Sequence, residues 1–135
     1  MKRAPGRSSS RGCTYTCGFC SQTQFWEKTW RARDPRCVAA EIETLKRDFG
    51  VDVVLLTDEY PTGDRARWEA FLDRMIELDL GVDLLMETRV PDIVRDRDIR
   101  SSLGAASLQE PVTFLVAQRN RARILVLFNR VIQDE

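Results

Sequence analysis

Apolar residues recur along the first two thirds of the chain in a pattern that predicts helices followed by strands. The first helix begins after the capping residue Asp34, has a proline in its first turn, and ends at Gly50. Its apolar face consists of residues spaced four, three and four apart: Val38, Ile42, Leu45 and Phe49. The next segment, 51–57, is rich in β-branched residues and nearly all apolar, which is typical of a strand covered on both faces.

The same order of elements repeats further along the chain. Turn residues 61–64 precede a second amphipathic helix, which Gly81 ends, and segment 82–86 is the second strand. The apolar face of this helix consists of Trp68, Phe71, Leu72, Met75 and Ile76. The tripeptide Gly-Val-Asp at 50–52 recurs at 81–83, 31 residues later. Such alternation predicts parallel strands joined by right-handed helical crossovers.

The length of the repeat indicates a fold class. A spacing of 31 residues matches the roughly 30 residues per unit of a βα barrel, in which about 250 residues make eight units. Because the chain has 135 residues, we predict an α/β fold with parallel strands in an open sheet, a partial (incomplete) βα barrel. Segment 91–99 is expected to form a short charged helix and 101–109 a loop, whereas 112–117 and 124–132 fit either strand or helix.

Composition narrows the chemistry that this chain can perform. The chain has 21 basic and 21 acidic residues, four cysteines and no histidine. Without histidine there is no Ser–His or Cys–His nucleophile pair, no histidine base and no histidine metal ligand. No apolar run is long enough to span a membrane, and the first residues do not form a secretory signal. We therefore expect a cytoplasmic protein whose chemistry comes from cysteines, carboxylates or a cofactor.

The neutral total hides a basic beginning. Residues 1–36 hold eight basic and two acidic side chains, an excess of six positive charges. We interpret residues 1–10 as a solvated start of the chain. Arg31 and Arg33 lie beyond the cysteines and are better candidates for binding an anionic ligand.

The sharpest feature is a short loop that contains three cysteines. Cys13, Cys17 and Cys20 are separated by three and two residues and are accompanied by Gly12 and Gly18. Three thiols cannot all pair with one another as disulfides, and this spacing favours metal ligands. With three ligands on one loop, the expected occupant is a cubane iron–sulfur cluster whose fourth iron stays open to a small molecule. The glycines would let the backbone pass close to the cluster.

Two alternatives remain at this point. A four-thiolate zinc site would recruit Cys37, 17 residues after Cys20, although zinc sites usually use two closely spaced pairs. We expect Cys37 instead to be a small buried apolar residue. The second alternative is a non-functional truncated remnant whose cysteines bind nothing.

The cysteine loop, with Phe19 directly before its last cysteine, resembles the signature of the radical S-adenosylmethionine (radical SAM) enzymes. Surrounding residues are similar to the cobalamin-binding branch, and within it to the oxidative cyclases that form the isocyclic ring of bacteriochlorophyll. The segments that carry this likeness are 10–13, 20–26, 31–35, 58–62 and 88–93. The resemblance covers about residues 8–99.

The resemblance implies cofactors, partners and residue roles. The three loop cysteines would hold a [4Fe-4S] cluster, and the open iron would bind S-adenosylmethionine, whose reductive cleavage yields a radical that abstracts hydrogen from a substrate. Phe19 would lie near the adenine, Asp58 and Glu59 near the SAM amino group, and Arg89 at the end of the next strand. The implied partners are a small-molecule substrate, a tetrapyrrole, and an external electron donor; no nucleic acid and no membrane span are expected.

Some features depart from the family pattern. The family often has proline at Thr14 and tryptophan at Thr23, and the strand expected before the loop is reduced to the polar residues 4–11. We therefore predict that 1–99 is the N-terminal part of a radical SAM core. Residues 100–135 are an unassigned tail, which a shifted reading frame would explain. Cobalamin would require a domain that this chain lacks.

Overall fold

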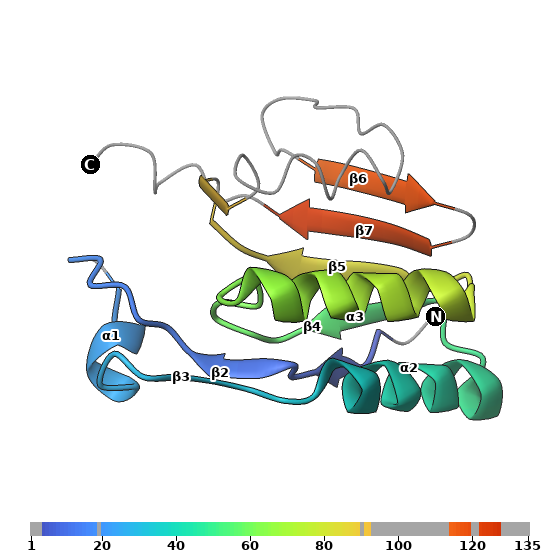
Figure 1. The fold of residues 1–135 in the computed structure, drawn as a ribbon, viewed down its shortest axis with the longest axis horizontal. Helices are drawn as coiled ribbons and strands as arrows, with labels where there is room; N and C mark the ends of the chain where they lie inside the picture. Colours follow the sequence, from blue (N-terminus) through green and yellow to red (C-terminus); the bar gives the residue numbers. More distant parts are fainter. Residues whose placement is uncertain (1–3, 19, 90, 93–113, 120–121, 128–135) are drawn as a thin grey trace.

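The computed structural model describes residues 4–18, 20–89, 91–92, 114–119 and 122–127 (Figure 1). Within these described ranges, five strands form one sheet in the order β1-β4-β5-β7-β6. Their bounds are β1 Gly6–Arg7, β4 Val53–Leu56, β5 Asp83–Glu87, β6 Phe114–Arg119 and β7 Ala122–Leu127. The β1–β4, β4–β5 and β5–β7 pairs are parallel and β6–β7 is antiparallel. The predicted α/β class with parallel strands is confirmed.

A second, two-stranded sheet leads away from the first (Figure 1). It pairs β2 (Ser10–Gly12) antiparallel with β3 (Trp30–Ala32), and we call it the β2–β3 ribbon. The short helix α1 (Gln22–Phe25) lies between its two strands in the sequence. The cysteine loop lies between β2 and α1. The ribbon and α1 therefore fix the positions of the two ends of this loop.

Helices α2 (Pro35–Phe49) and α3 (Arg65–Leu78) carry the core. Their buried residues form one cluster with alternate residues of β4 and β5, so both helices cover the same face of the sheet. The cluster includes Val38, Ile42, Leu45, Val54, Leu56, Trp68, Phe71, Leu72, Met75, Leu84 and Met86. The remaining β4 residues, Val53 and Leu55, are only half-buried. In the described part of the chain, the second face of β4 is therefore covered less completely than the first.

The ends of α2 agree with the sequence patterns. Asp34 caps the helix by accepting a 2.8 Å hydrogen bond from the Arg36 N–H, and Gly50 ends it in a left-handed conformation with φ 63°. Phe49, expected on the buried face, is instead 73% exposed. It is the last residue of α2, where the chain turns away from the core.

The end of α3 differs from the prediction. The helix ends at Leu78, and Asp79, rather than Gly81, is the residue after it, with φ 41°. Gly81 is also left-handed, at φ 62°, but stands two residues further on. Sequence patterns favour glycine at such a position, yet aspartate is one of the few other residues that tolerate this conformation.

Replacing Asp79 with glycine is therefore expected to stabilise the protein. The left-handed conformation costs a residue other than glycine about 1–2 kcal/mol in the folded state. Glycine avoids this strain, but its greater freedom in the unfolded chain cancels about half of the gain in stability. We expect a gain of about 0.5–1 kcal/mol in the free energy of unfolding, measured by urea denaturation. Gly50→Ala is the converse change at the end of α2 and should lose about 1 kcal/mol. Equal effects of the two substitutions would contradict this account.

Some expectations fall on residues outside the described ranges. Only the first two residues of the predicted helix 91–99 are described, and they are helical; the predicted loop 101–109 is not described. The two ambiguous apolar segments correspond to the strands β6 and β7. The division of the chain at residue 99 stays a prediction. Among the described helices, none has the length and apolar character needed to cross a membrane.

Candidate metal centre and cofactor site

The chain that leads into the cysteine loop is held by a buried carboxylate. Asp58 lies two residues after the end of β4 and is 6% exposed. It accepts hydrogen bonds from the Ser9 N–H at 2.7 Å, the Ser10 hydroxyl at 2.8 Å and the Ser9 hydroxyl. Both serines are buried, at 0% and 1% exposure. The polar segment 4–11, which we expected to be a shortened strand, thus contains β1, the anchored Ser9 and the start of β2 at Ser10.

Arg67 of α3 holds the same segment from the other side. Its guanidinium donates to the carbonyl oxygens of Ser9 at 2.6 Å, Arg33 at 3.1 Å and Pro61 at 3.3 Å. Burial lowers the pKa of Arg67, and the charge of Asp58 acts in the opposite direction. Arg67 therefore joins the segment between β1 and β2, the residue after β3 and the loop after β4. The sequence contains no local signal for this role.

Glu59 connects the two ends of the cysteine loop. Its carboxylate accepts hydrogen bonds from the Gly12 N–H and from the Trp26 indole N–H, both at 3.2 Å. Gly12 precedes Cys13, and Trp26 follows α1. A Cβ at Gly12, where φ is 90°, would lie 2.1 Å from the Thr29 carbonyl oxygen. The glycine is therefore required by the close approach of the ribbon strands, in addition to any approach to a cluster.

The three loop cysteines are free and partly buried. Burial raises the pKa of Cys13, and the nearby thiols of Cys17 and Cys20 raise it further, whereas the Tyr15 N–H and the Arg89 charge lower it. Cys13 thus has both other loop thiols in its electrostatic environment. Within the part of the chain that the structure describes, no three such ligands are gathered tightly enough for a single metal ion. The cysteines of a cubane bind three different irons, so the donor set fits a cluster of that kind.

Cys37, the fourth thiol of the zinc alternative, is exposed on α2. We expected it to be buried, and this expectation is wrong. Val38 and Ala39 take the buried positions of the first helical turn and place Cys37 on the solvent face.

Arg89 follows β5 and reaches the cysteine loop. Its guanidinium carbon lies 3.4 Å from the centre of the Tyr15 ring, which is a close cation–π contact. Its Nε atom is buried without a hydrogen-bond partner among the described residues. Tyr15 also packs edge-to-face on Tyr60, with ring centres 5.3 Å apart. An unpaired buried donor on a cation beside Cys13 can bind an anionic group of a ligand.

The structure brings most of the predicted site residues together. Asp58, Glu59 and Arg89 lie beyond the carboxyl ends of β4 and β5 with the cysteine loop beside them, as parallel α/β sites require. Phe19 lies outside the described residues. Sequence reasoning missed Tyr15, Arg67 and the two serines of the anchor, since their partners are distant in sequence.

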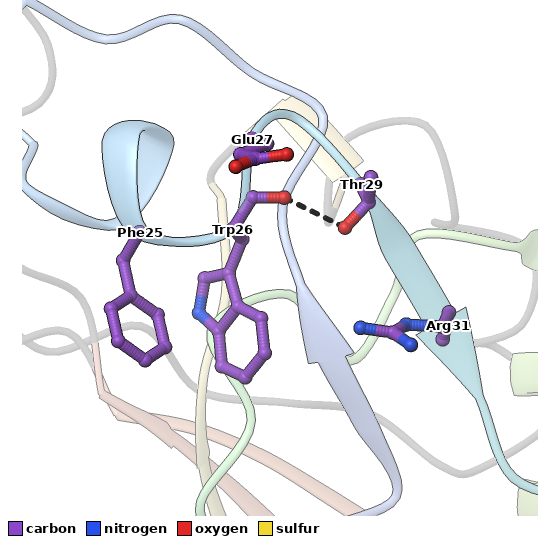
Figure 2. Close-up of a pocket in the computed structure, with 5 residues that line it drawn as sticks. All are labelled: Phe25, Trp26, Glu27, Thr29 and Arg31. Carbon is purple, nitrogen blue, oxygen red and sulfur yellow. Dashed lines mark hydrogen bonds between the residues drawn. The ribbon is translucent and has the colours of Figure 1, made fainter.

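The two arginines proposed for an anionic ligand have different environments. Arg33 is already neutralised by a bidentate ion pair with Glu41, and it also donates to the Ser8 carbonyl at 3.0 Å. Arg31 lines an open pocket of about 590 Å³ with Phe25, Trp26, Glu27 and Thr29 (Figure 2). Of the two, Arg31 is therefore the one available to a ligand.

Comparisons with known proteins show the family of the chain. A Radical SAM superfamily model matches residues 8–105. The chain is 39% identical over 111 residues to the anaerobic magnesium-protoporphyrin IX monomethyl ester cyclase of Synechocystis sp., covering 82% of this chain and 21% of that protein. It is 43% identical over 107 residues to the enzyme of the same name from Rubrivivax gelatinosus, covering 79% of this chain and 19% of that protein.

A shorter match involves an enzyme with a different name. The chain is 38% identical over 56 residues to the cytidylyl-2-hydroxyethylphosphonate methyltransferase of Streptomyces wedmorensis, covering 42% of this chain and 10% of that protein. No solved structure matches significantly. The chain spans about a fifth of the length of the cyclases that it matches. The family match nevertheless covers well over half of this chain and includes all three loop cysteines, so the chain belongs to the radical SAM superfamily.

Proposed function

We propose that Cys13, Cys17 and Cys20 hold a [4Fe-4S] cluster and that this chain supplies part of the SAM site of an anaerobic cyclase. One observation carries the proposal: Glu59 fastens the cysteine loop to the end of β4, and Arg89 reaches the same loop from the end of β5. Two strand ends and a loop with three thiols thus meet at one place. Membership of the superfamily implies a [4Fe-4S] cluster and S-adenosylmethionine as cofactors.

The chain's own residues would bind and orient the cofactors. When bound at the three loop cysteines, the cluster would supply one-electron reducing chemistry to S-adenosylmethionine. Arg89 offers an unpaired cation to the carboxylate of S-adenosylmethionine. Glu59 is the better of the two predicted amino-group contacts, because Asp58 already accepts three hydrogen bonds from the serine anchor. The position of Phe19 near the adenine stays a prediction.

The substrate follows from the relatives. The curated cyclases are named for magnesium-protoporphyrin IX monomethyl ester, and we propose the same tetrapyrrole ester for the enzyme to which this chain corresponds. The reduction requires an external one-electron donor. Cobalamin, a cytoplasmic location and the absence of a nucleic-acid partner stay predictions from the sequence, and we assign no residue of this chain to cobalamin.

The SAM assignment predicts a specific effect of Arg89. Arg89→Gln should weaken the binding of S-adenosylmethionine to the cluster-loaded chain by about 10- to 150-fold, because a charge-assisted hydrogen bond contributes about 1.5–3 kcal/mol. Binding is measured anaerobically by equilibrium dialysis, with the change in the EPR spectrum of the reduced cluster as a second readout. Arg74→Gln, which removes an exposed arginine paired with Glu77 on α3, is the matched control. Equal affinities of the two variants would show that Arg89 does not contact the carboxylate.

A further inference from the structure

The outer face of the β2–β3 ribbon carries an arrangement that the cofactor site does not explain. Arg11 of β2 and Arg31 of β3 lie directly opposite each other in the antiparallel pairing. Opposed residues of such a pair project from the same face, and like charges placed this way destabilise the pair. Both side chains are exposed. Neither makes a hydrogen bond or an ion pair in the described part of the chain, so the repulsion is not relieved.

The two faces of the ribbon have opposite characters. On the inner face Ser10 and Gly12 are buried and bind the carboxylates of Asp58 and Glu59. These carboxylates do not neutralise the arginines of the outer face, because their partners are the two serines, the Gly12 N–H and the Trp26 indole. The exposed arginines of the outer face thus remain as net positive charge.

The surroundings of Arg31 extend this surface. Phe25, at the end of α1, is 73% exposed and packs edge-to-face on Trp26 with ring centres 4.8 Å apart. Figure 2 shows both rings lining the same pocket as Arg31. In the turn between Trp26 and Arg31, Glu27 and Lys28 have φ values of 50° and 58°, a strained conformation for residues other than glycine. We define the basic ribbon face as Arg11, Phe25 and Arg31.

The composition of the basic ribbon face favours a protein partner over a small molecule. Exposed aromatic rings flanked by arginine are the residues that are enriched at protein interfaces and their hot spots. The pocket is open to solvent, whereas sites for small molecules enclose most of their ligand. With one acid, Glu27, and two exposed arginines that have no ion pair among the described residues, the charge complement of this surface is an acidic protein.

The position of the basic ribbon face indicates what such a partner does. Gly12 joins β2 directly to Cys13, and α1 begins two residues after Cys20. A protein seated on this face would therefore lie next to the cysteine loop. We propose that the basic ribbon face docks an acidic electron-donor protein, which transfers one electron to the cluster and is itself oxidised by one electron. This inference rests on the proposed function for the identity of the partner.

The test measures docking apart from activity. The probe is a plant-type [2Fe–2S] ferredoxin chosen for an acidic surface, and its Kd is measured by anaerobic calorimetry at low and at high NaCl. Arg11→Gln combined with Arg31→Gln should raise the Kd about tenfold at low salt, with the difference shrinking at high salt. Phe25→Ser should also weaken binding about tenfold, with little dependence on salt. Arg47→Gln combined with Arg74→Gln removes the same charge from α2 and α3 and should change the Kd less than about twofold.

Several results would overturn the docking proposal. Equal weakening by the two double variants would indicate non-specific attraction, and binding that ignores salt and both ribbon variants would place the partner elsewhere. Binding of inorganic pyrophosphate with no binding of ferredoxin would assign the face to a small anion. The hydrogen bonds from the ribbon to Asp58 and Glu59 do not depend on a cluster, so the basic ribbon face should form in the cluster-free chain as well. The Kd for ferredoxin is therefore measured before and after cluster loading. The iron content of the reconstituted chain tests the proposed function. The Kd for ferredoxin tests the docking proposal separately.

Discussion

Replacing any one of Cys13, Cys17 and Cys20 with alanine should abolish the uptake of a cubane cluster, whereas Cys37→Ala should leave it unchanged. The three loop thiols are partly buried, and those of Cys17 and Cys20 affect the pKa of Cys13, whereas Cys37 is exposed on α2. A cluster that loses one of three protein ligands has two anchored irons left, too few to keep it on a short loop. Anaerobic reconstitution followed by iron and sulfide analysis should find about four irons in the parent chain and close to none in each loop variant.

The Cys37 variant separates the two metal hypotheses. A four-thiolate zinc site would need Cys37, so its loss would reduce zinc binding as strongly as the loss of a loop cysteine. Such a protein would be colourless with one zinc per chain, whereas a cluster protein would be brown and bleach in air. Iron uptake that is insensitive to Cys13→Ala would refute the cluster assignment. An insoluble chain without metal would support the alternative of a non-functional remnant.

The helix–strand units could be predicted because local and long-range signals agree there. Asp34 caps α2 and Gly50 ends it, and the apolar residues that recur along the helix are largely those that pack on β4 and β5. At the end of α3 the local signal was misleading, since Gly81 has the expected residue type but Asp79 takes the left-handed position. Residue type alone does not distinguish two neighbouring candidates for a helix end.

The anchoring of the cysteine loop could not be predicted from the sequence. Ser9 and Ser10 read as polar residues in a weak strand, because the carboxylate that makes them a buried anchor is 48 or 49 residues away. Arg33 and Arg31 look equivalent in the sequence, and only the fold shows that Glu41 occupies the first. The chemistry of the site was therefore visible in the cysteine spacing, whereas the residues that position it depended on tertiary contacts.

Asp58→Ala should be the most destabilising carboxylate substitution among the residues discussed above. The change removes the acceptor of three hydrogen bonds and leaves the Ser9 N–H and two hydroxyls buried without it. Breaking a buried charged network of this kind loses about 3–5 kcal/mol. We expect a loss of that size in the free energy of unfolding, measured by urea denaturation of the parent and variant chains.

Two further variants calibrate this effect. Asp58→Asn keeps the size of the side chain but replaces one acceptor oxygen by an amide donor, and should lose roughly half as much. Asp34→Asn makes the same chemical change at the exposed cap of α2, where asparagine is an equally good cap, and should lose less than about 0.5 kcal/mol. Trypsin provides a local readout, since release of the serine anchor should speed cleavage after Arg7 and Arg11.

The Asp58 variants also decide between the two roles that this residue has been given. If Asp58 serves as the anchor, Asp58→Asn should lower stability and speed cleavage after Arg11, and S-adenosylmethionine should bind normally to the fraction that remains folded. If Asp58 instead contacts the SAM amino group, as the family resemblance predicts, stability should hardly change and the affinity for S-adenosylmethionine should fall. Because all three hydrogen bonds from the serines end on its two oxygens, we expect the first result and leave the amino group to Glu59.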